Sequence, residues 1–151
     1  PFLKGLMPMK ISARNRLKCT VEEIQEGAVN GIVVMNLHDK ATLKADITMD
    51  AIKDLELAPG KEACAVIKAT NVLFAKGGKI ANISARNQLT GTITELEKGA
   101  VNGRVTIQLG PKGTCVSGTI TNDAIDSLGL AEGDEATAII KATDVLVAVC
   151  G

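Results

Sequence analysis

Residues 11–15 read Ile-Ser-Ala-Arg-Asn, and the same five residues return at 83–87, which lie 72 positions further along the chain. A second motif, Gly-Ala-Val-Asn-Gly at 27–31, returns with the same spacing at 99–103. Internal similarity at this period indicates two copies of one small domain. Polar residues that are kept in both copies are therefore candidates for a shared binding site.

A third repeated motif helps to set the boundaries of the two copies. Ile-Lys-Ala-Thr at 67–70 returns at 140–143 with a spacing of 73, so one residue has been gained between the second and third motifs. We expect a first copy at 9–79 and a second copy at 80–151, preceded by an N-terminal extension at 1–8. Units of about 70 residues are near the lower limit for burying a stable core alone, so each is expected to need a partner surface.

Composition excludes several classes of partner. The chain has 17 basic and 17 acidic residues, so it has no excess positive charge to attract nucleic acid. Its only aromatic side chains are two phenylalanines, which removes the stacking platforms that nucleic acids and flat heterocycles require. A small, non-aromatic ligand held by local groups is favoured.

The cysteines and the hydropathy pattern point to the cytoplasm. The four cysteines show no Cys-x-x-Cys spacing and are interpreted as small apolar side chains in a reducing compartment. No stretch has the length that a bilayer span needs, and residues 1–8 do not form a signal peptide. We therefore expect a cytoplasmic protein with no membrane partner.

Short β-strands dominate the pattern of each copy, with one helix between them. Strands are expected at 17–24, 32–37 and 63–75, and again at 89–96, 104–109 and 136–149, because these segments are rich in β-branched and apolar residues. Helices are expected at 48–57 and 121–130, each opened by a threonine cap. The predicted fold is all-β with one short helix per copy, arranged as tandem five-stranded Greek-key barrels of the OB type.

The first motif brings a hydroxyl, a guanidinium and a carboxamide together at the start of a strand. With the backbone N–H donors between them, these groups can surround a tetrahedral oxyanion. The plain alternative is a solvated strand start with a surface arginine, but the repetition favours a site. The candidates are Ser12, Ala13, Arg14, Asn15, Ser84, Ala85, Arg86 and Asn87.

In the third motif a cation and a hydroxyl interrupt an apolar strand. A charge at such a position lies at the end of the strand or has a partner. The lysine is either the counter-charge of a bound anion or a rim residue that reaches water through its alkyl stem. The candidates are Lys68, Ala69, Thr70, Lys141, Ala142 and Thr143.

The second motif also has two interpretations. Asn-Gly between two strands is typical of a two-residue hairpin turn with positive φ. A turn that directs successive N–H groups to one side instead forms an anion-binding nest, which small side chains keep accessible. The candidates are Gly27, Ala28, Val29, Asn30, Gly99, Ala100, Val101 and Asn102.

The sequence has no catalytic constellation that both copies share. His38 is the only histidine, so neither a Ser-His-Asp arrangement nor a histidine metal site can be built twice. Glycine-rich phosphate-binding runs are absent as well. We therefore expect a binding protein without catalytic activity, without a cofactor and without metal coordination by side chains.

Taken together, the three motifs resemble the Mop domain of molbindins, small cytoplasmic proteins that bind molybdate and tungstate. The resemblance covers residues 9–150 and implies OB-type barrels, a homotrimer and two classes of oxyanion site between subunits. One class would use the Ser-Ala-Arg-Asn and Lys-Ala-Thr residues, and the other would use the Gly-Ala-Val-Asn turns near a threefold axis. An OB-type nucleic-acid or pterin-binding module is the alternative, and the lack of aromatic side chains argues against it.

Overall fold

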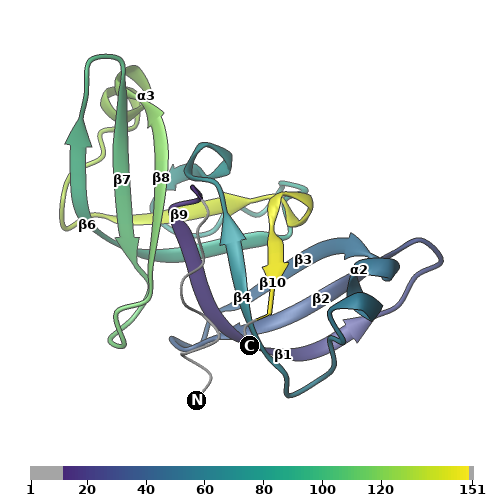
Figure 1. Ribbon diagram of the computed structural model, residues 1–151. Coiled ribbons are helices and arrows are strands. Elements are labelled where there is room, and N and C mark those ends of the chain that lie inside the picture. Colours follow the sequence, from purple (N-terminus) through teal and green to yellow (C-terminus); the bar gives the residue numbers. More distant parts are fainter. Residues whose placement is uncertain (1–11, 150–151) are drawn as a thin grey trace.

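The computed structural model describes residues 12–149, which form two five-stranded sheets (Figure 1). The first copy contributes β1 (Asn15–Gln25), β2 (Asn30–Leu37), β3 (Thr42–Thr48), α2 (Met49–Asp54), β4 (Glu62–Ile67), the 3-10 helix η1 (Ala69–Asn71) and β5 (Leu73–Lys76). The second copy repeats this order with β6 (Asn87–Lys98), β7 (Asn102–Gln108), β8 (Cys115–Thr121), α3 (Asn122–Leu128), β9 (Glu135–Ile140), η2 (Ala142–Asp144) and β10 (Leu146–Ala148). The expected mainly β fold is confirmed.

The two copies exchange their last strands. The first sheet has the order β10-β4-β1-β2-β3, and the second has the order β5-β9-β6-β7-β8. Leu146 of β10 pairs with Val66 of β4, and Leu73 of β5 pairs with Ile139 of β9, both antiparallel. The spans 9–79 and 80–151 therefore describe the sequence repeat, whereas each sheet contains one strand from the other copy.

The exchange explains why the expected strand at 63–75 is wrong as a continuous element. The chain leaves the first sheet after β4, turns through η1 and enters the second sheet as β5. The turn is closed by a hydrogen bond of 3.0 Å from Asn71 N–H to the Lys68 carbonyl, and Asp144 donates to Lys141 in the same way at 2.9 Å. The expected strand at 136–149 breaks at the same point, so the Lys-Ala-Thr motif forms the crossover between sheets.

The expected Asn-Gly hairpin turn with positive φ is also wrong. Asn30 and Gly31 are the first two residues of β2, and neither has a positive φ. A Cβ at Gly31 would lie 2.8 Å from Ile52 Cδ1, and a Cβ at Gly103 would lie 2.6 Å from Ile125 Cδ1. Glycine at these positions leaves room for the helix side chains that pack onto the strand, and it does not serve a turn with positive φ.

Each helix is held at its N-terminus as the sequence predicted. The Thr48 hydroxyl accepts a hydrogen bond of 3.1 Å from Ala51 N–H, and the Thr121 hydroxyl accepts one of the same length from Ala124 N–H. Such caps satisfy backbone donors that have no partner within the helix. Among the described residues, no helix is long and apolar enough to cross a membrane.

Candidate functional site

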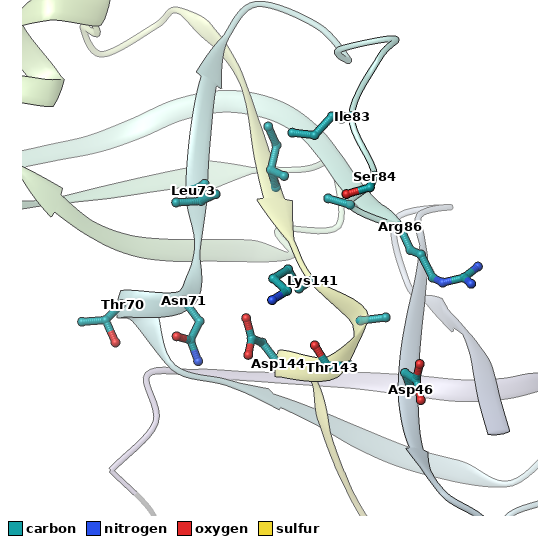
Figure 2. A pocket seen from close by; sticks show the side chains of 13 residues that line it. Asp46, Thr70, Asn71, Leu73, Ile83, Ser84, Arg86, Lys141, Thr143 and Asp144 are labelled. Atoms are coloured by element: carbon teal, nitrogen blue, oxygen red, sulfur yellow. The ribbon is translucent and has the colours of Figure 1, made fainter. Parts of the chain in front are cut away.

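The first and third motifs meet where the copies cross. A pocket of about 520 Å³, here called the larger pocket, lies between the start of β6 and the two crossover turns (Figure 2). It contains Ser84 and Lys141 of the second copy and Thr70 of the first. Its lining residues are Asp46, Thr70, Asn71, Leu73, Ile83, Ser84, Ala85, Arg86, Ile139, Lys141, Ala142, Thr143 and Asp144.

A second pocket repeats this arrangement with the copies reversed. This smaller pocket has a volume of about 290 Å³ and combines Ser12 and Lys68 of the first copy with Thr143 of the second. Its lining residues are Ser12, Ala13, Val66, Lys68, Asn71, Thr143, Asp144 and Leu146. The strand exchange thus places a serine and a lysine of one copy against the crossover turn of the other.

Lys68 and Lys141 are both exposed and begin their 3-10 turns. Neither makes an ion pair with any residue in the range 12–149. A strand end gives the ammonium group access to solvent without burying a charge. Both lysines are therefore available as counter-charges for an anion in the pocket that each one lines.

Asn15 and Asn87 do not line either pocket. Asn15 Nδ2 donates to the carbonyl of Ser117 at 2.7 Å, and Asn15 Oδ1 accepts from Ser117 N–H at 2.8 Å. Asn87 makes the matching pair with Lys44, at 2.8 Å to its carbonyl and 2.7 Å from its N–H. Both side chains are buried and bind the backbone of the opposite copy, so they clamp the two copies together.

The remaining residues of the first and third motifs lie in different surroundings. Arg86 lines the larger pocket, but its guanidinium points away from Lys141 (Figure 2). Arg14 is exposed and lines neither pocket, and Ala69 is buried beside the crossover. Ala13, Ala85 and Ala142 line the pockets as expected for small residues near a ligand.

Two acidic side chains in the pockets were missed from the sequence. Asp144 lines both pockets, and Asp46 lines the larger one. Asp144 follows Lys-Ala-Thr directly, where the first copy has Asn71, so position in the motif was the available signal. Asp46 comes from the middle of β3 and has no such signal. These carboxylates reduce the positive potential that an anion would meet.

The Gly-Ala-Val-Asn turns lie far from both pockets. The β1–β2 tip lies beside α2 at one end of the molecule, and the β6–β7 tip lies beside α3 at the other (Figure 1). Val29 and Val101 at these tips are 74% and 70% exposed. The two turns cannot converge on one ligand within a single chain.

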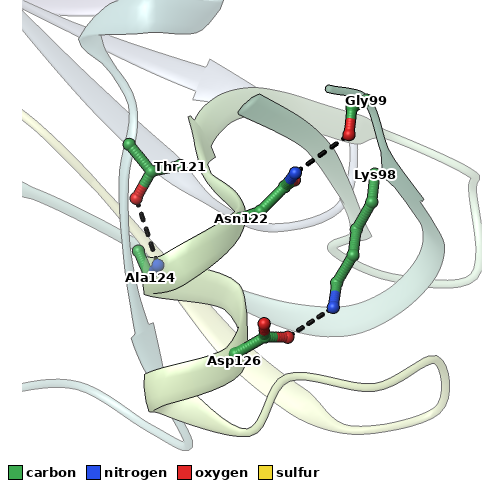
Figure 3. A network of polar contacts seen from close by, with 6 residues as sticks. All are labelled: Lys98, Gly99, Thr121, Asn122, Ala124 and Asp126. Carbon is green, nitrogen blue, oxygen red and sulfur yellow. Dashed lines mark hydrogen bonds and ion pairs between the residues drawn. The ribbon is translucent and has the colours of Figure 1, made fainter. Parts of the chain in front are cut away.

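The tip of the second copy is held by a polar network (Figure 3). Asn122 Nδ2 donates to the Gly99 carbonyl at 2.9 Å, and Lys98 forms an ion pair with Asp126. In addition, Asn122 N–H donates to the Val101 carbonyl at 2.8 Å. The helix therefore fixes the conformation of the turn that follows Lys98.

Metal coordination by side chains finds no support in the part of the chain that the structure describes. No group of three or more His, Cys, Asp or Glu residues is placed there so that it could hold a metal ion. Besides the carboxylates of Asp46 and Asp144, the candidate site offers hydroxyl, ammonium and backbone donors, which are suited to an oxyanion.

A family model describes both copies. The TOBE domain model matches residues 11–74 and 83–147, which include all three motifs of each copy. The chain belongs to the TOBE domain family.

Similar proteins are known from several organisms. The chain is 40% identical to the molybdenum transport protein ModE of Herbaspirillum seropedicae over 152 residues, which cover 99% of this chain and 56% of ModE. It is 41% identical to the molybdenum-pterin-binding protein MopA of Rhodobacter capsulatus over 145 residues, which cover 95% of this chain and 54% of MopA. The chain therefore spans about half the length of these relatives.

One solved structure matches along nearly its whole length. It is the cytoplasmic molybdate-binding protein ModG with molybdate bound, which superposes with a TM-score of 0.88 at 45% identity. The match covers 93% of this chain and 99% of that chain. These similarities confirm the resemblance to tandem Mop-domain proteins and the tandem OB-type fold.

Proposed function

We propose that this chain binds molybdate and tungstate and serves to store and buffer these oxyanions. The observation that carries the proposal is the reciprocal construction of the two pockets, in which each lysine-serine pair meets the crossover turn of the other copy. The similarity to ModG, whose crystal structure contains molybdate, supports the same ligand.

The chemistry of the pockets fits a tetrahedral dianion. Hydroxyl groups, backbone N–H groups and one lysine can hold such an ion without a basic protein surface. Sulfate shares the charge and the shape, so discrimination would rest on the size of the cavity. Within this proposal the protein has no catalytic role, since it needs only to bind and release the anion.

We further propose a homotrimer in which the sites are completed by neighbouring copies of the chain. Leu73 and Leu146 are 56% and 55% exposed, and each lines one of the pockets. Val29 and Val101 are exposed at the turns that cannot meet within one chain. A threefold axis brings three copies of one turn to one point and covers apolar side chains that are otherwise in water.

The remaining expectations follow from this assignment. A cytoplasmic location agrees with the similarity to the cytoplasmic protein ModG, and no nucleic-acid partner is needed for storage. Pterin binding is the alternative that the names of some relatives suggest. Phe74, the only Phe, Tyr or Trp in the range 12–149, is buried in the core, so among the described residues no ring of this kind is available to stack on a pterin.

Calorimetric titration of the purified chain with molybdate, tungstate, sulfate, phosphate and a pterin tests the ligand. We expect molybdate and tungstate to bind at least about tenfold more tightly than sulfate, a difference of about 1.4 kcal/mol. Equal affinity for sulfate and molybdate would overturn the assignment. Light scattering with and without molybdate tests the assembly, and a monomer that binds molybdate at full stoichiometry would overturn the shared sites.

A further inference from the structure

A third cavity carries a concentration of positive charge, of which only Arg86 also lines a proposed molybdate pocket. It has a volume of about 540 Å³ and lies between the β2–β3 hairpin of the first copy and the start of β6. Lys40, Lys44, Lys79 and Arg86 line it, and Asp39 is the only acidic residue among its lining residues. We call this cavity the basic groove.

The single carboxylate does not neutralise these cations. Asp39 Oδ1 accepts a hydrogen bond of 2.7 Å from Lys112 N–H, and Asp39 Oδ2 accepts one of 2.8 Å from Thr114 N–H. None of the four cationic side chains makes an ion pair with a residue in the range 12–149. Four cations therefore face one cavity in a chain whose formal net charge is zero.

The position of Arg86 links the groove to the larger pocket without making them one site. Arg86 lines both, and its guanidinium points away from Lys141 (Figure 2). The three lysines of the groove do not line the larger pocket. An anion in the groove would therefore meet a set of cations that is almost entirely separate.

Charge of the same sign recurs at the equivalent place in the other copy. A cavity beside the β7–β8 hairpin is lined by Arg16, Lys18 and Lys112, with no acidic residue among its lining residues. Lys112 lies in the loop of this hairpin, directly before Gly113. Basic residues therefore gather at both places where a hairpin of one copy lies beside the first strand of the other copy.

The backbone of Lys40 adds a second observation. Lys40 has a φ of 59°, in the left-handed region that side chains rarely adopt, whereas the corresponding turn uses Gly113 with a φ of 83°. Glycine would remove the strain at position 40. Strained residues persist where the surrounding structure holds them, and they are frequent at binding sites.

We propose that the basic groove binds a diphosphate group. Each phosphoryl group carries a charge of about −1.5 to −2 at pH 7, so a diphosphate provides about three negative charges for the four cations. A single tetrahedral oxyanion would leave most of these cations without a partner in a cavity of about 540 Å³. This inference goes beyond molybdate binding and does not depend on it.

The groove recognises the diphosphate and not an attached base. Its apolar lining residues are Ala41, Leu89 and Leu109, and none of its lining residues is aromatic. A nucleobase would therefore gain no stacking. Free pyrophosphate and the diphosphate end of a nucleotide share the relevant chemistry, and we expect ADP to bind within about threefold of pyrophosphate.

Calorimetry of the full chain with inorganic pyrophosphate, ADP and adenosine, in the presence of saturating molybdate, tests the proposal. We expect one pyrophosphate per chain and no binding of adenosine. Lys40→Gly is expected to weaken pyrophosphate binding by about tenfold or more while Tm stays unchanged or rises, because a charge-assisted contact is lost and the strain is removed. Lys44→Gln combined with Lys79→Gln is expected to weaken it by at least as much.

Two control variants match these changes outside the groove. Glu56→Gly removes a left-handed residue with a φ of 54°, and Lys53→Gln removes an exposed lysine of α2. Both should bind pyrophosphate like the unmodified chain, and all variants should bind molybdate with unchanged stoichiometry. The proposal would be overturned by an absence of saturable pyrophosphate binding, by one-for-one displacement of molybdate, by equal binding of adenosine, or by full affinity in Lys40→Gly.

Discussion

The larger and the smaller pocket are built from the same motifs, yet their volumes are about 520 and 290 Å³. The two pockets also differ in a lining residue outside the motifs. Asp46 lines only the larger pocket, and the position equivalent to Asp46 is Thr119 in the second copy. A duplicated sequence therefore repeats the donors for a ligand but not the space in which they act.

The contacts between the copies show the same combination of repetition and divergence. The clamps of Asn15 and Asn87 are equivalent, because each amide binds the backbone of the opposite copy. The contact of Asp39 with the β7–β8 hairpin has no equivalent, since the corresponding loop at 110–113 has no acidic residue. The repeated contacts define the arrangement of the sheets, and the unrepeated one distinguishes the two hairpins.

The largest expected effect is on stability, from Asn15→Ala compared with Asn87→Ala. Each change leaves the backbone N–H and carbonyl of the opposite copy without their partner, which costs about 1–3 kcal/mol. Asn15 also donates to the Ile67 carbonyl at 3.2 Å, so we expect Asn15→Ala to cost more. Thermal unfolding should show a fall in Tm of about 2–4 °C per kcal/mol.

Gln88→Ala provides the matched control for the clamps. The Gln88 amide makes a similar pair of hydrogen bonds, of 2.8 and 2.7 Å, with the backbone of Ile80 in the same copy. Because that pair is exposed and local, its loss should change Tm much less. Equal losses in the three variants would contradict a special role for contacts between the copies.

The next effect concerns the ligand, and Lys141→Ala and Lys68→Ala compare the two pockets directly. Each substitution should weaken molybdate binding at its own pocket by about tenfold, because one counter-charge is lost. Titration calorimetry should show one class of sites weakened in each variant, with Tm of the ligand-free protein almost unchanged. If the double variant binds molybdate like the original chain, both lysines are ordinary rim residues.

A smaller effect on stability, which depends on acidic pH, is expected at the contact between Asp39 and the β7–β8 hairpin. Burial opposes the ionisation of Asp39, but hydrogen bonds from Thr114 and Lys112 outweigh it and lower the pKa of this carboxyl below its ordinary value of 3.8. The stabilisation is therefore fully present above that value and is lost as the pH falls through the lowered pKa.

Unfolding of Asp39→Asn and of the original chain at a series of pH values measures this contribution. The original chain should be more stable at neutral pH, and the difference should disappear in acid. A difference that does not change with pH would show that the charge of Asp39 has no part in the contact.

The smallest effect on stability is expected at the β6–β7 turn of the second copy. Lys98 and Asp126 form an exposed ion pair, and pairs of this kind contribute about 0.2–1 kcal/mol. Glu26 and Lys53 occupy the corresponding positions in the first copy with the charges reversed. Lys98→Ala should lower Tm slightly in low salt and not at all in high salt, and Lys53→Ala should show no change in either. Loss of Tm that persists in high salt would indicate lost packing instead.

The sequence by itself determined the elements whose causes are local. The strand expected at 17–24 and the threonine caps of α2 and α3 depend on neighbours within a few residues, and they were predicted correctly. The resemblance of the three motifs to the Mop domain also indicated the family, and the lack of aromatic residues favoured a small, non-aromatic ligand. The assignment of Ser12, Lys68, Ser84 and Lys141 to oxyanion sites remains a prediction, although the structure brings these residues into two pockets.

Only the tertiary structure decided which sheet each final strand joins. Leu73–Lys76 is a suitable strand for either sheet, and its own pattern does not state which edge it will pair with. The same holds for Asn15, whose amide looks available for a ligand until Ser117, 102 residues away in sequence, occupies it. Hydrogen bonds to backbone groups that are distant in sequence leave no pattern in the sequence, because the packing of the two copies determines which groups become partners.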